Sequence, residues 1–253
     1  LYDEQLPVLE ELQKRSELNG VEVKLLSKEE VIKLEPNINP NVKGALFAPT
    51  CGIIDPFNLA VHAMENAVDN GVKLNLEEEV ICITNKSEYY LVKTNKNEYE
   101  AKVVINCAGL ASDKIAKMVE DLDWNNTPRK GEYYVLDHYA PGLVNHTIFP
   151  LPSEKGKGIL VTMTTSGNYL VGPSSEPIDD IDAVSTAKAT LNNVKKQALD
   201  MVPSIPFAQT VRVFSGNRPT SSRHDFIIEH AKDQPRFINV AGIESPGLVS
   251  SPA

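Results

Sequence analysis

Hydrophobic residues follow a helical period in five stretches of the chain. Apolar side chains that recur every three or four residues indicate a helix with one buried face. The longest such stretch, 183–201, carries Val184, Leu191 and Val194 on one side and precedes Pro203, which cannot continue a helix. The predicted helices are 1–18, 27–35, 56–69, 111–119 and 183–201.

Residues at the helix borders support these assignments. Ser27 and Glu30 form a capping box at the start of the second helix. Pro56 occupies the first position of the third helix, where a missing backbone N–H costs nothing, and Gly71 follows the last turn of that helix.

Shorter apolar runs that are bounded by turn residues predict strands. Before residue 107 strands and helices are mixed. Strands 89–94 and 99–103 are predicted to form a hairpin around Asn95-Lys-Asn97, and the continuous apolar run 103–107 is typical of a buried parallel strand. From residue 129 onward several strands follow one another directly, which indicates an antiparallel sheet. The predicted strands are 21–26, 72–74, 80–84, 89–94, 99–103, 103–107, 131–136, 145–151, 158–164, 168–172, 211–216, 226–229 and 237–241, while 37–49 is expected to be mainly loop.

The order of these elements predicts two discontinuous domains in a mixed α/β (α+β) fold. Residues 46–124 and 215–253 form the domain in which strands and helices alternate. Residues 1–45 and 125–214 form the second domain, an antiparallel sheet with flanking helices.

Composition limits the classes of partner. The 253-residue chain is 42% hydrophobic and 23% charged, which are ordinary values for a globular protein. Its net charge of −9 argues against nucleic acid or an anionic membrane surface as a general partner. A small anionic substrate stays compatible, because it needs only local Arg or Lys side chains. No apolar run reaches the roughly 20 residues of a membrane span.

The three cysteines, Cys51, Cys82 and Cys107, fit neither a metal-ligand nor a disulfide pattern. Their apolar neighbours predict buried, reduced thiols, and this favours a cytoplasmic location. The histidines also lack metal-ligand spacing, so no metal site is predicted. Among them His146 is singled out because it begins an otherwise apolar run.

Three glycine-containing turns follow predicted strands. They are Val104-Ile-Asn-Cys-Ala-Gly-Leu110, Phe214-Ser-Gly-Asn-Arg-Pro219 and Gly242-Ile-Glu-Ser-Pro-Gly-Leu248. Each has a simpler interpretation: an ordinary strand-to-helix turn, an exposed arginine at a strand end, and a helix cap. In the third turn Ser245 is expected to cap a helix that begins at Pro246, and the bare backbone at Gly242 and Gly247 would let a planar cofactor approach.

In this order, and together with Gly52-Ile-Ile-Asp-Pro56, the three motifs resemble the FAD-dependent oxidoreductases of the D-amino-acid oxidase superfamily. Gly131-Glu-Tyr-Tyr134, Asn145-His-Thr-Ile-Phe-Pro150 and Leu170-Val-Gly-Pro173 are most similar to its glycerol-3-phosphate dehydrogenase-like branch, with L-2-hydroxyglutarate dehydrogenase a close relative. The resemblance covers nearly the whole chain. It implies that 46–124 and 215–253 form a partial, Rossmann-like FAD-binding domain and that the remainder binds substrate.

One feature of that superfamily is absent. Its members begin with a strand and a Gly-x-Gly-x-x-Gly loop that holds the FAD pyrophosphate, and this sequence contains no such loop. The sequence is therefore expected to be a fragment of a longer enzyme, which binds FAD weakly or not at all without the missing segment.

The resemblance implies a division of the cofactor between two turns. The reduced flavin gathers negative charge that oriented backbone N–H groups stabilise, so the flavin is assigned to the terminal turn. The adenosine side is assigned to the turn after 103–107. The assigned cofactor residues are Val80, Ala108, Gly109, Gly216, Gly242, Ile243, Glu244, Ser245, Gly247 and Leu248.

Arg218 is the first candidate for the substrate anion, because a guanidinium grips a phosphate or carboxylate in two places. Tyr133 and Arg212 are further substrate candidates, and Arg223 is a weaker one. His146 is the candidate acceptor of the substrate's hydroxyl proton, so that His146 and Arg218 form the catalytic set. A purely structural role for His146 is an equal alternative.

The implied activity is oxidation of sn-glycerol 3-phosphate to dihydroxyacetone phosphate, with electrons passed through FAD to a quinone or another acceptor. One alternative is oxidation of L-2-hydroxyglutarate or of another hydroxy or amino acid. Another is a catalytically inert folded core. No nucleic acid partner is expected, the branch allows peripheral association with the inner face of the cell membrane, and the oligomeric state stays open.

Overall fold

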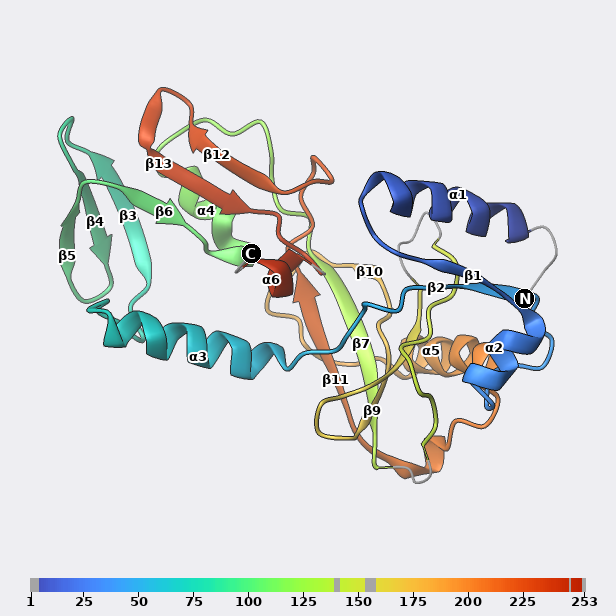
Figure 1. Ribbon diagram of the computed structural model, residues 1–253. Helices are drawn as coiled ribbons and strands as arrows, with labels where there is room; N and C mark the ends of the chain where they lie inside the picture. The colour runs from blue at the N-terminus through green and yellow to red at the C-terminus, as the bar shows by residue number, and fades with distance from the viewer. Residues whose placement is uncertain (1–4, 139–141, 153–157, 246, 252–253) are drawn as a thin grey trace. The chain divides into compact units, whose positions relative to one another are not determined.

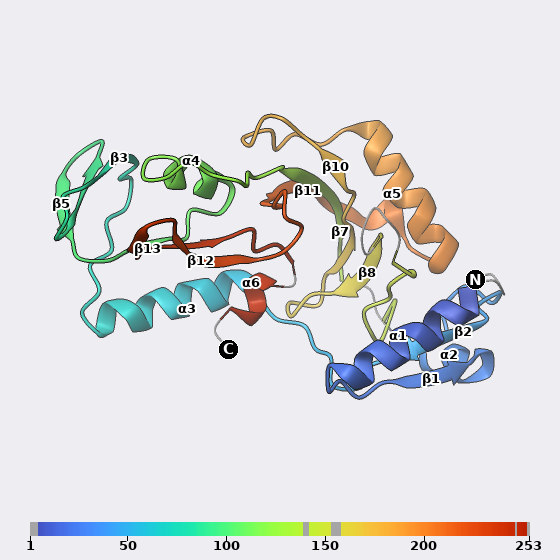
Figure 2. The same cartoon turned by 90° about the horizontal axis from the view of Figure 1, so that it is seen from above.

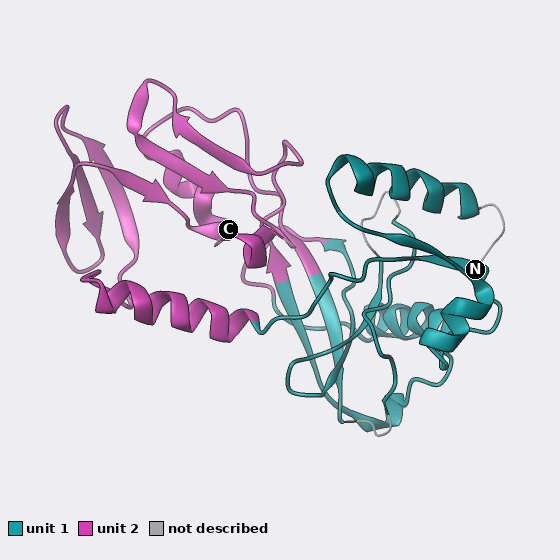
Figure 3. Cartoon of the chain, viewed as in Figure 1, with its two compact units in different colours: residues 1–55, 131–176, 184–216 teal, residues 56–130, 177–183, 217–253 magenta. Residues whose placement is uncertain are grey.

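The computed structural model describes residues 5–138, 142–152, 158–245 and 247–251. The chain divides into two compact units, each assembled from separate stretches (Figure 3). Unit 1 comprises 1–55, 131–176 and 184–216, and unit 2 comprises 56–130, 177–183 and 217–253. The mixed α/β fold class predicted from the sequence is confirmed.

An antiparallel sheet forms the centre of unit 1 (Figure 1). β9 pairs with β7 on one side and with β8 on the other, and Val171 lies opposite both Tyr134 and Val161. The elements here are β7 (Arg129–Leu136), β8 (Leu160–Met163), β9 (Tyr169–Gly172), β10 (Glu176–Pro177), β11 (Thr210–Arg218), α5 (Lys188–Met201) and the 3-10 helix η3 (Phe207–Gln209), with β10 and β11 also pairing with β7.

The core of unit 1 lies between this sheet and α5. Alternation along the strands turns Val161 and Val171 to the face that meets Val194 and Ala198 of the helix, and these four side chains are fully buried. The helix begins later than the predicted position 183. The N–H of Ala187 donates to Glu132 Oε2 (3.0 Å), which holds the preceding backbone extended.

A small layer of helices and strands completes unit 1. β1 pairs with β2 in antiparallel register, and α1 packs along this pair (Figures 1 and 2). The predicted capping box is confirmed, because Ser27 N–H donates to Glu30 Oε2 (2.7 Å) while Glu30 N–H donates to Ser27 Oγ (3.4 Å). The elements are α1 (Leu6–Leu18), β1 (Lys24–Ser27), α2 (Lys28–Leu34) and β2 (Gly44–Phe47). β2 corrects the prediction of a loop at 37–49, which ignored its distant partner strand.

Unit 2 contains two three-stranded sheets. In the first the order is β12-β13-β6, with β13 parallel to β6 and antiparallel to β12. In the second β4 lies between β3 and β5. The elements are α3 (Pro56–Asp69), β3 (Val80–Asn85), β4 (Tyr90–Thr94), β5 (Glu98–Ala101), β6 (Val104–Asn106), the 3-10 helix η2 (Gly109–Ala111), α4 (Ser112–Ala116), β12 (Ile227–Ala231), β13 (Gln234–Ala241) and α6 (Gly247–Ser250). Pro246, the predicted first residue of the last helix, lies outside the described residues.

Several predicted strands differ from the structure. β6 is parallel as expected, but it is only partly buried, since Ile105 is 60% exposed while Asn106 is buried. Residues 72–74 form no strand, because no neighbouring strand pairs with them among the described residues. In 145–151 only Ile148 makes an isolated bridge, to Val161.

Two predictions of burial are wrong as well. All three cysteines are free and exposed. The apolar side of α3 is also uncovered within the described residues, and no residue of this helix is buried. Phe57, Val61, Met64 and Val68 follow one another at spacings of four, three and four residues, so they form an exposed apolar stripe on one face. None of the helices in the described ranges is both long and apolar enough to cross a bilayer.

Candidate functional site

Two turns predicted to bind a cofactor lie at the same edge of a sheet in unit 2. β6 and β13 are parallel neighbours, and Asn239 lies opposite Asn106. Parallel strands place their carboxyl ends together, which is where open α/β sheets bind ligands. The turn with Ala108 and Gly109 follows β6, and Gly242 follows β13. The structure therefore brings together these two predicted segments, although they are more than a hundred residues apart in the sequence.

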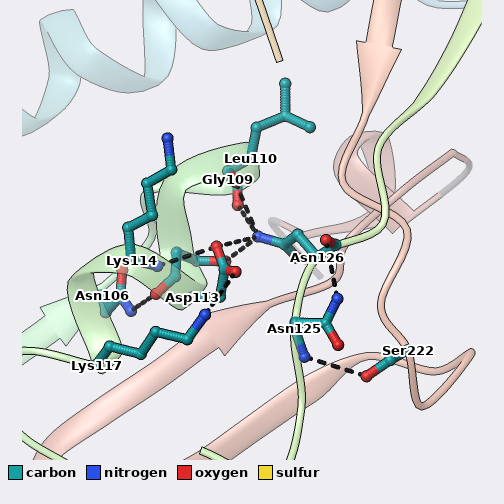
Figure 4. A network of polar contacts seen from close by, with 10 residues as sticks. Asn106, Gly109, Leu110, Asp113, Lys114, Lys117, Asn125, Asn126 and Ser222 are labelled. Carbon is teal, nitrogen blue, oxygen red and sulfur yellow. Dashed lines mark hydrogen bonds and ion pairs between the residues drawn. The ribbon is translucent and has the colours of Figure 1, made fainter. Parts of the chain in front are cut away.

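The side chain of Asn126, which lies beyond this turn in the sequence, forms hydrogen bonds to the turn after β6 (Figure 4). The Asn126 side-chain nitrogen donates to the carbonyl oxygens of Gly109 (3.1 Å) and Leu110 (3.0 Å), and it lies 3.3 Å from Asp113 Oδ1. Gly109 adopts a φ of 55°, and a Cβ atom there would enter open space. The exposed backbone of this turn is thus fixed on one side and accessible on the other.

The turn after β13 is packed closely against the segment 221–226. Gly242 has a φ of 66°, and a Cβ atom there would lie 2.9 Å from Ser221 Cβ and 3.0 Å from the Asp225 carbonyl oxygen. A Cβ atom at Gly247 would collide with the ring of Phe226. These contacts give internal packing as a second reason for glycine at 242 and 247, beside the approach of a cofactor that the sequence predicts.

Replacing Gly242 with alanine is expected to lower the free energy of unfolding by about 1–3 kcal/mol, since a non-glycine residue at positive φ is strained and the new methyl group meets Ser221. Urea unfolding of the variant measures this difference. Gly52→Ala is a matched control, because its Cβ would meet nothing within 4 Å and its φ is not positive. Equal losses in the two variants would contradict the packing argument.

The arginine motif approaches the same turn. Two residues after Arg218, Thr220 donates its hydroxyl proton to Glu244 Oε2 (2.9 Å), and its carbonyl accepts the N–H of Thr127 (2.7 Å). Ser221 also forms an isolated bridge with Asn126. Arg218 itself is half-buried at the end of β11. The end of the arginine motif, at Arg218 and Pro219, and the two turns therefore come together in unit 2, joined by Thr220 and Asn126.

Ile243, Ser245 and Leu248 complete the predicted flavin turn. The turn is closed by the N–H of Gly247, which donates to the Glu244 carbonyl (2.8 Å). Ile243 is half-buried, whereas Ser245 and Leu248 are exposed. The turn therefore presents one exposed side.

Val80 packs beside the first turn's strand. It contacts the core cluster of Ile83, Tyr90 and Phe237, and Val104 of β6 packs against the same cluster.

Glu78, two residues before Val80, accepts hydrogen bonds from the hydroxyl of Tyr99 and from two further side chains. Desolvation opposes its ionisation, but these bonds outweigh it and lower the pKa of Glu78.

The remaining substrate candidates belong to unit 1. Tyr133 stacks on Phe214, with ring centroids 5.0 Å apart and planes at 6°. Strand alternation places Arg212, Phe214 and Gly216 on one face of β11, and Arg212 and Gly216 are exposed. These predicted residues therefore share a strand face with the aromatic stack.

His146 lies on the wall of a cavity of about 650 Å³ in unit 1, which is lined mainly by apolar side chains. Its Nδ1 atom is 2.7 Å from Glu35 Oε1, and the buried Glu35 carboxylate also accepts the N–H of Asn145 (2.9 Å). The ring meets Phe47 edge-on at 5.2 Å. A buried carboxylate fixes the imidazole orientation, which suits a proton acceptor and a structural link equally.

Arg223 is already paired with protein carboxylates. Its guanidinium donates to Glu229 (2.9 and 3.0 Å) and to Asp123 (2.5 Å). Hydrogen bonds to Glu229 and Asp123 raise the pKa of Arg223. Two carboxylates compensate its charge, so the structure does not favour Arg223 as a substrate anion site.

Asn126, Thr220 and Asn239 were not identified from the sequence. Each acts through contacts with residues far away in the chain, at separations of 13 to 133 residues in the bonds described. The available sequence signal was weak, because Asn and Thr are common turn residues.

Glycine turns at the carboxyl ends of parallel strands, joined to an antiparallel sheet, define a class of proteins that bind a nucleotide cofactor beside a substrate. The family model for FAD dependent oxidoreductases (DAO) matches residues 1–253. The chain belongs to this family, as its motifs predicted.

Two individual relatives show which members of the family this chain resembles. The chain is 46% identical over 252 residues to a glycerol 3-phosphate dehydrogenase from Caloramator mitchellensis, a match that covers 99% of this chain and 52% of the relative. It is 33% identical over 258 residues to a glycerol 3-phosphate oxidase from Mycoplasma pneumoniae, covering 99% of this chain and 67% of the relative. The chain thus spans about half to two thirds of these relatives. The similarity confirms the branch that the motifs indicated.

A solved structure has the same fold as this chain. Dithionite-reduced L-alpha-glycerophosphate oxidase from Mycoplasma pneumoniae, with FAD bound, superimposes with a TM-score of 0.90 at 30% sequence identity. The match covers 99% of this chain and 68% of that chain.

Proposed function

We propose that the protein oxidises sn-glycerol 3-phosphate to dihydroxyacetone phosphate with FAD, and that a quinone or another acceptor takes the electrons. The observation that carries this proposal is that the two turns and the end of the arginine motif come together in unit 2, within a chain whose relatives are named for glycerol 3-phosphate.

The residues of unit 2 fit an FAD molecule. FAD supplies the hydride acceptor of the reaction when bound. The turn at 242–248 would hold the flavin through backbone N–H groups, and Ala108 and Gly109 would hold the adenosine side. The open space beside Gly109 supports this assignment, since nothing within 4 Å blocks an approach to its backbone. Val80 of unit 2 is a further proposed contact, and so is Gly216, which belongs to unit 1.

Arg218 is proposed to bind the phosphate of the substrate. A guanidinium can donate two parallel hydrogen bonds to such a group and stays charged at any physiological pH. Tyr133 and Arg212 are proposed as supporting substrate contacts in unit 1. The stacked ring of Phe214 restricts the orientation of the Tyr133 ring, and this supports a role for Tyr133 in binding substrate.

His146 is proposed to accept the proton of the oxidised hydroxyl. In this role the Glu35 carboxylate would hold the Nδ1 proton and leave Nε2 as the accepting atom, because a neutral imidazole has one donor and one acceptor nitrogen. The alternative is that the pair only joins 35 to 145–146.

Anaerobic flavin bleaching tests the substrate. The protein is loaded with FAD, and glycerol 3-phosphate or L-2-hydroxyglutarate is added in separate experiments. Bleaching of the visible flavin bands by glycerol 3-phosphate alone is expected. Bleaching by L-2-hydroxyglutarate alone would replace the proposal with the hydroxy-acid alternative.

A second candidate is a folded core that binds no FAD. The absence of a Gly-x-Gly-x-x-Gly loop in the sequence favours it. The visible absorbance of the purified chain after equilibration with FAD and gel filtration decides between the two. Stoichiometric flavin would exclude the inert core, and a colourless protein would support it.

Peripheral association with a membrane is a further proposal. Flotation of the protein with lipid vesicles in a density gradient tests it.

A further inference from the structure

Two asparagine side chains meet between the adjacent strands β6 and β13. Asn106 and Asn239 are opposite each other in the parallel register and are 3% and 0% exposed. The Asn106 side-chain nitrogen donates to Asn239 Oδ1 (2.9 Å) and to the carbonyl oxygen of Ser112 (2.8 Å). The Asn239 side-chain nitrogen donates to Glu120 Oε1 (2.9 Å). A series of linked hydrogen bonds, buried except at Glu120, thus runs from Ser112 through Asn106 and Asn239 to Glu120.

The direction of this series is fixed at both ends. Asn106 Oδ1 accepts the N–H of Ala108 (3.3 Å), and a backbone N–H can only donate. At the other end Glu120 accepts the side-chain protons of Asn239 through one oxygen and the N–H of Lys232 (2.6 Å) through the other. Each asparagine therefore has one orientation that satisfies its neighbours, and a flipped amide would oppose like groups.

Two buried amides are unusual at this place. Strands in parallel sheets carry mainly Val, Ile and Leu, and an apolar pair would fill the same position without any hydrogen-bonding requirement. A fully satisfied polar network adds rigidity and a unique alignment that apolar contacts do not impose. Since Asn106 precedes Ala108 by two residues and Asn239 precedes Gly242 by three, the alignment concerns the two turns directly.

We propose that Asn106 and Asn239 are positioning residues that couple the turn at 107–112 to the turn at 242–248, so that a cofactor held by both turns meets them in one fixed alignment. The proposal rests on the proposed function for the identity of the cofactor, FAD. The coupling of the two turns is a property of the chain without ligand.

Amide hydrogen exchange in the absence of FAD tests the coupling crosswise. Asn239→Leu should raise exchange at 107–112, and Asn106→Leu should raise exchange at 242–245, each by tenfold or more. Once Asn106 is replaced, the further change Asn239→Leu should add little to exchange at 107–112, because the shared bond between the two amides is already lost, and the converse should hold at 242–245. The milder Asn239→Ser and Asn106→Ser variants serve if the leucine variants do not fold, since a serine side chain is too short to bridge the strands.

Ile83→Val is the matched control. Ile83 is buried in the core of the same unit, in a hydrophobic cluster whose described members include no residue of 107–112 or 242–245, so it reports general loosening. The coupling is overturned if each asparagine variant raises exchange only in the turn that follows its own strand, or if Ile83→Val reproduces the crosswise pattern.

FAD titration then tests the role in cofactor binding. The dissociation constant is expected to rise at least tenfold in both single variants, and the visible circular dichroism of bound flavin should change shape, whereas Ile83→Val should keep the wild-type spectrum. Unchanged affinity and spectrum would overturn the positioning role. If the wild-type protein binds no FAD, the proposed function fails and so does this cofactor role, while the exchange experiment still decides the coupling.

Discussion

Replacing Arg218 with alanine is expected to lower kcat/KM for the anionic substrate by about 30- to 4000-fold, which corresponds to about 2–5 kcal/mol for the loss of a hydrogen-bonded charge partner. The side chain is half-buried at the end of β11, and the following residues are anchored to the turn after β13 through Thr220 and Glu244. A guanidinium held in this way is better oriented than one on a free surface. Steady-state kinetics with the FAD-loaded protein measure the effect.

Two further arginine variants sharpen this experiment. Arg218→Lys keeps the charge but loses the planar pair of donors, so an intermediate loss is expected. Arg212→Ala removes an exposed arginine from the same strand, and a loss of less than tenfold is expected there. Wild-type kinetics in Arg218→Ala would show that Arg218 is structural. A greater loss in Arg212→Ala would move the anion site along β11.

Replacing Glu35 with alanine is expected to lower the free energy of unfolding by about 2–4 kcal/mol, because hydrogen bonds to a charged group are worth about 1.5–3 kcal/mol each. The buried carboxylate accepts the N–H of Asn145 and contacts Nδ1 of His146. Its removal leaves the Asn145 N–H without its acceptor and weakens the link between the end of α2 and 145–146, where the Asn145 side chain still donates to the Leu34 carbonyl oxygen (2.6 Å). Urea unfolding measures the change.

Glu29→Ala is the matched control for this variant. Glu29 is on the neighbouring helix α2 but is exposed, so a change within about 0.5 kcal/mol is expected for the same substitution. A His146→Gln variant separates the two roles of the pair. If it lowers kcat without lowering stability, His146 acts in proton transfer. If stability falls while kcat per folded molecule is unchanged, the structural alternative is correct.

Local signals in the sequence predicted local structure well. The capping box of Ser27 and Glu30, the helix start at Pro56 and the hairpin of β4 and β5 all depend on neighbours within a few residues. The parallel strand before Ala108 was also predicted, since continuous apolar runs are typical of such strands. Contacts between residues that are close in the chain can be predicted from a single sequence, because both partners occur within the same short segment.

Long-range partners were not visible. β2 was missed because its residues form a strand only against β1. The run after Asn145 was predicted as a strand, but the Glu35 carboxylate, 110 residues away in the chain, takes the backbone N–H that would begin it. Likewise, the resemblance identified Gly109 and Gly242 as site residues, while the side chains that hold those turns, Asn126 and Thr220, came only from the fold.

The apolar stripe on α3 has a consequence for the protein as a solute. Phe57 is 82% exposed and Val61 is 52% exposed, so the side of the helix that carries them faces water. Sulfate and phosphate are excluded from protein surfaces and therefore favour states that hide apolar area. The stripe should make precipitation begin at low concentrations of ammonium sulfate, despite a net charge of −9 that would otherwise keep molecules apart.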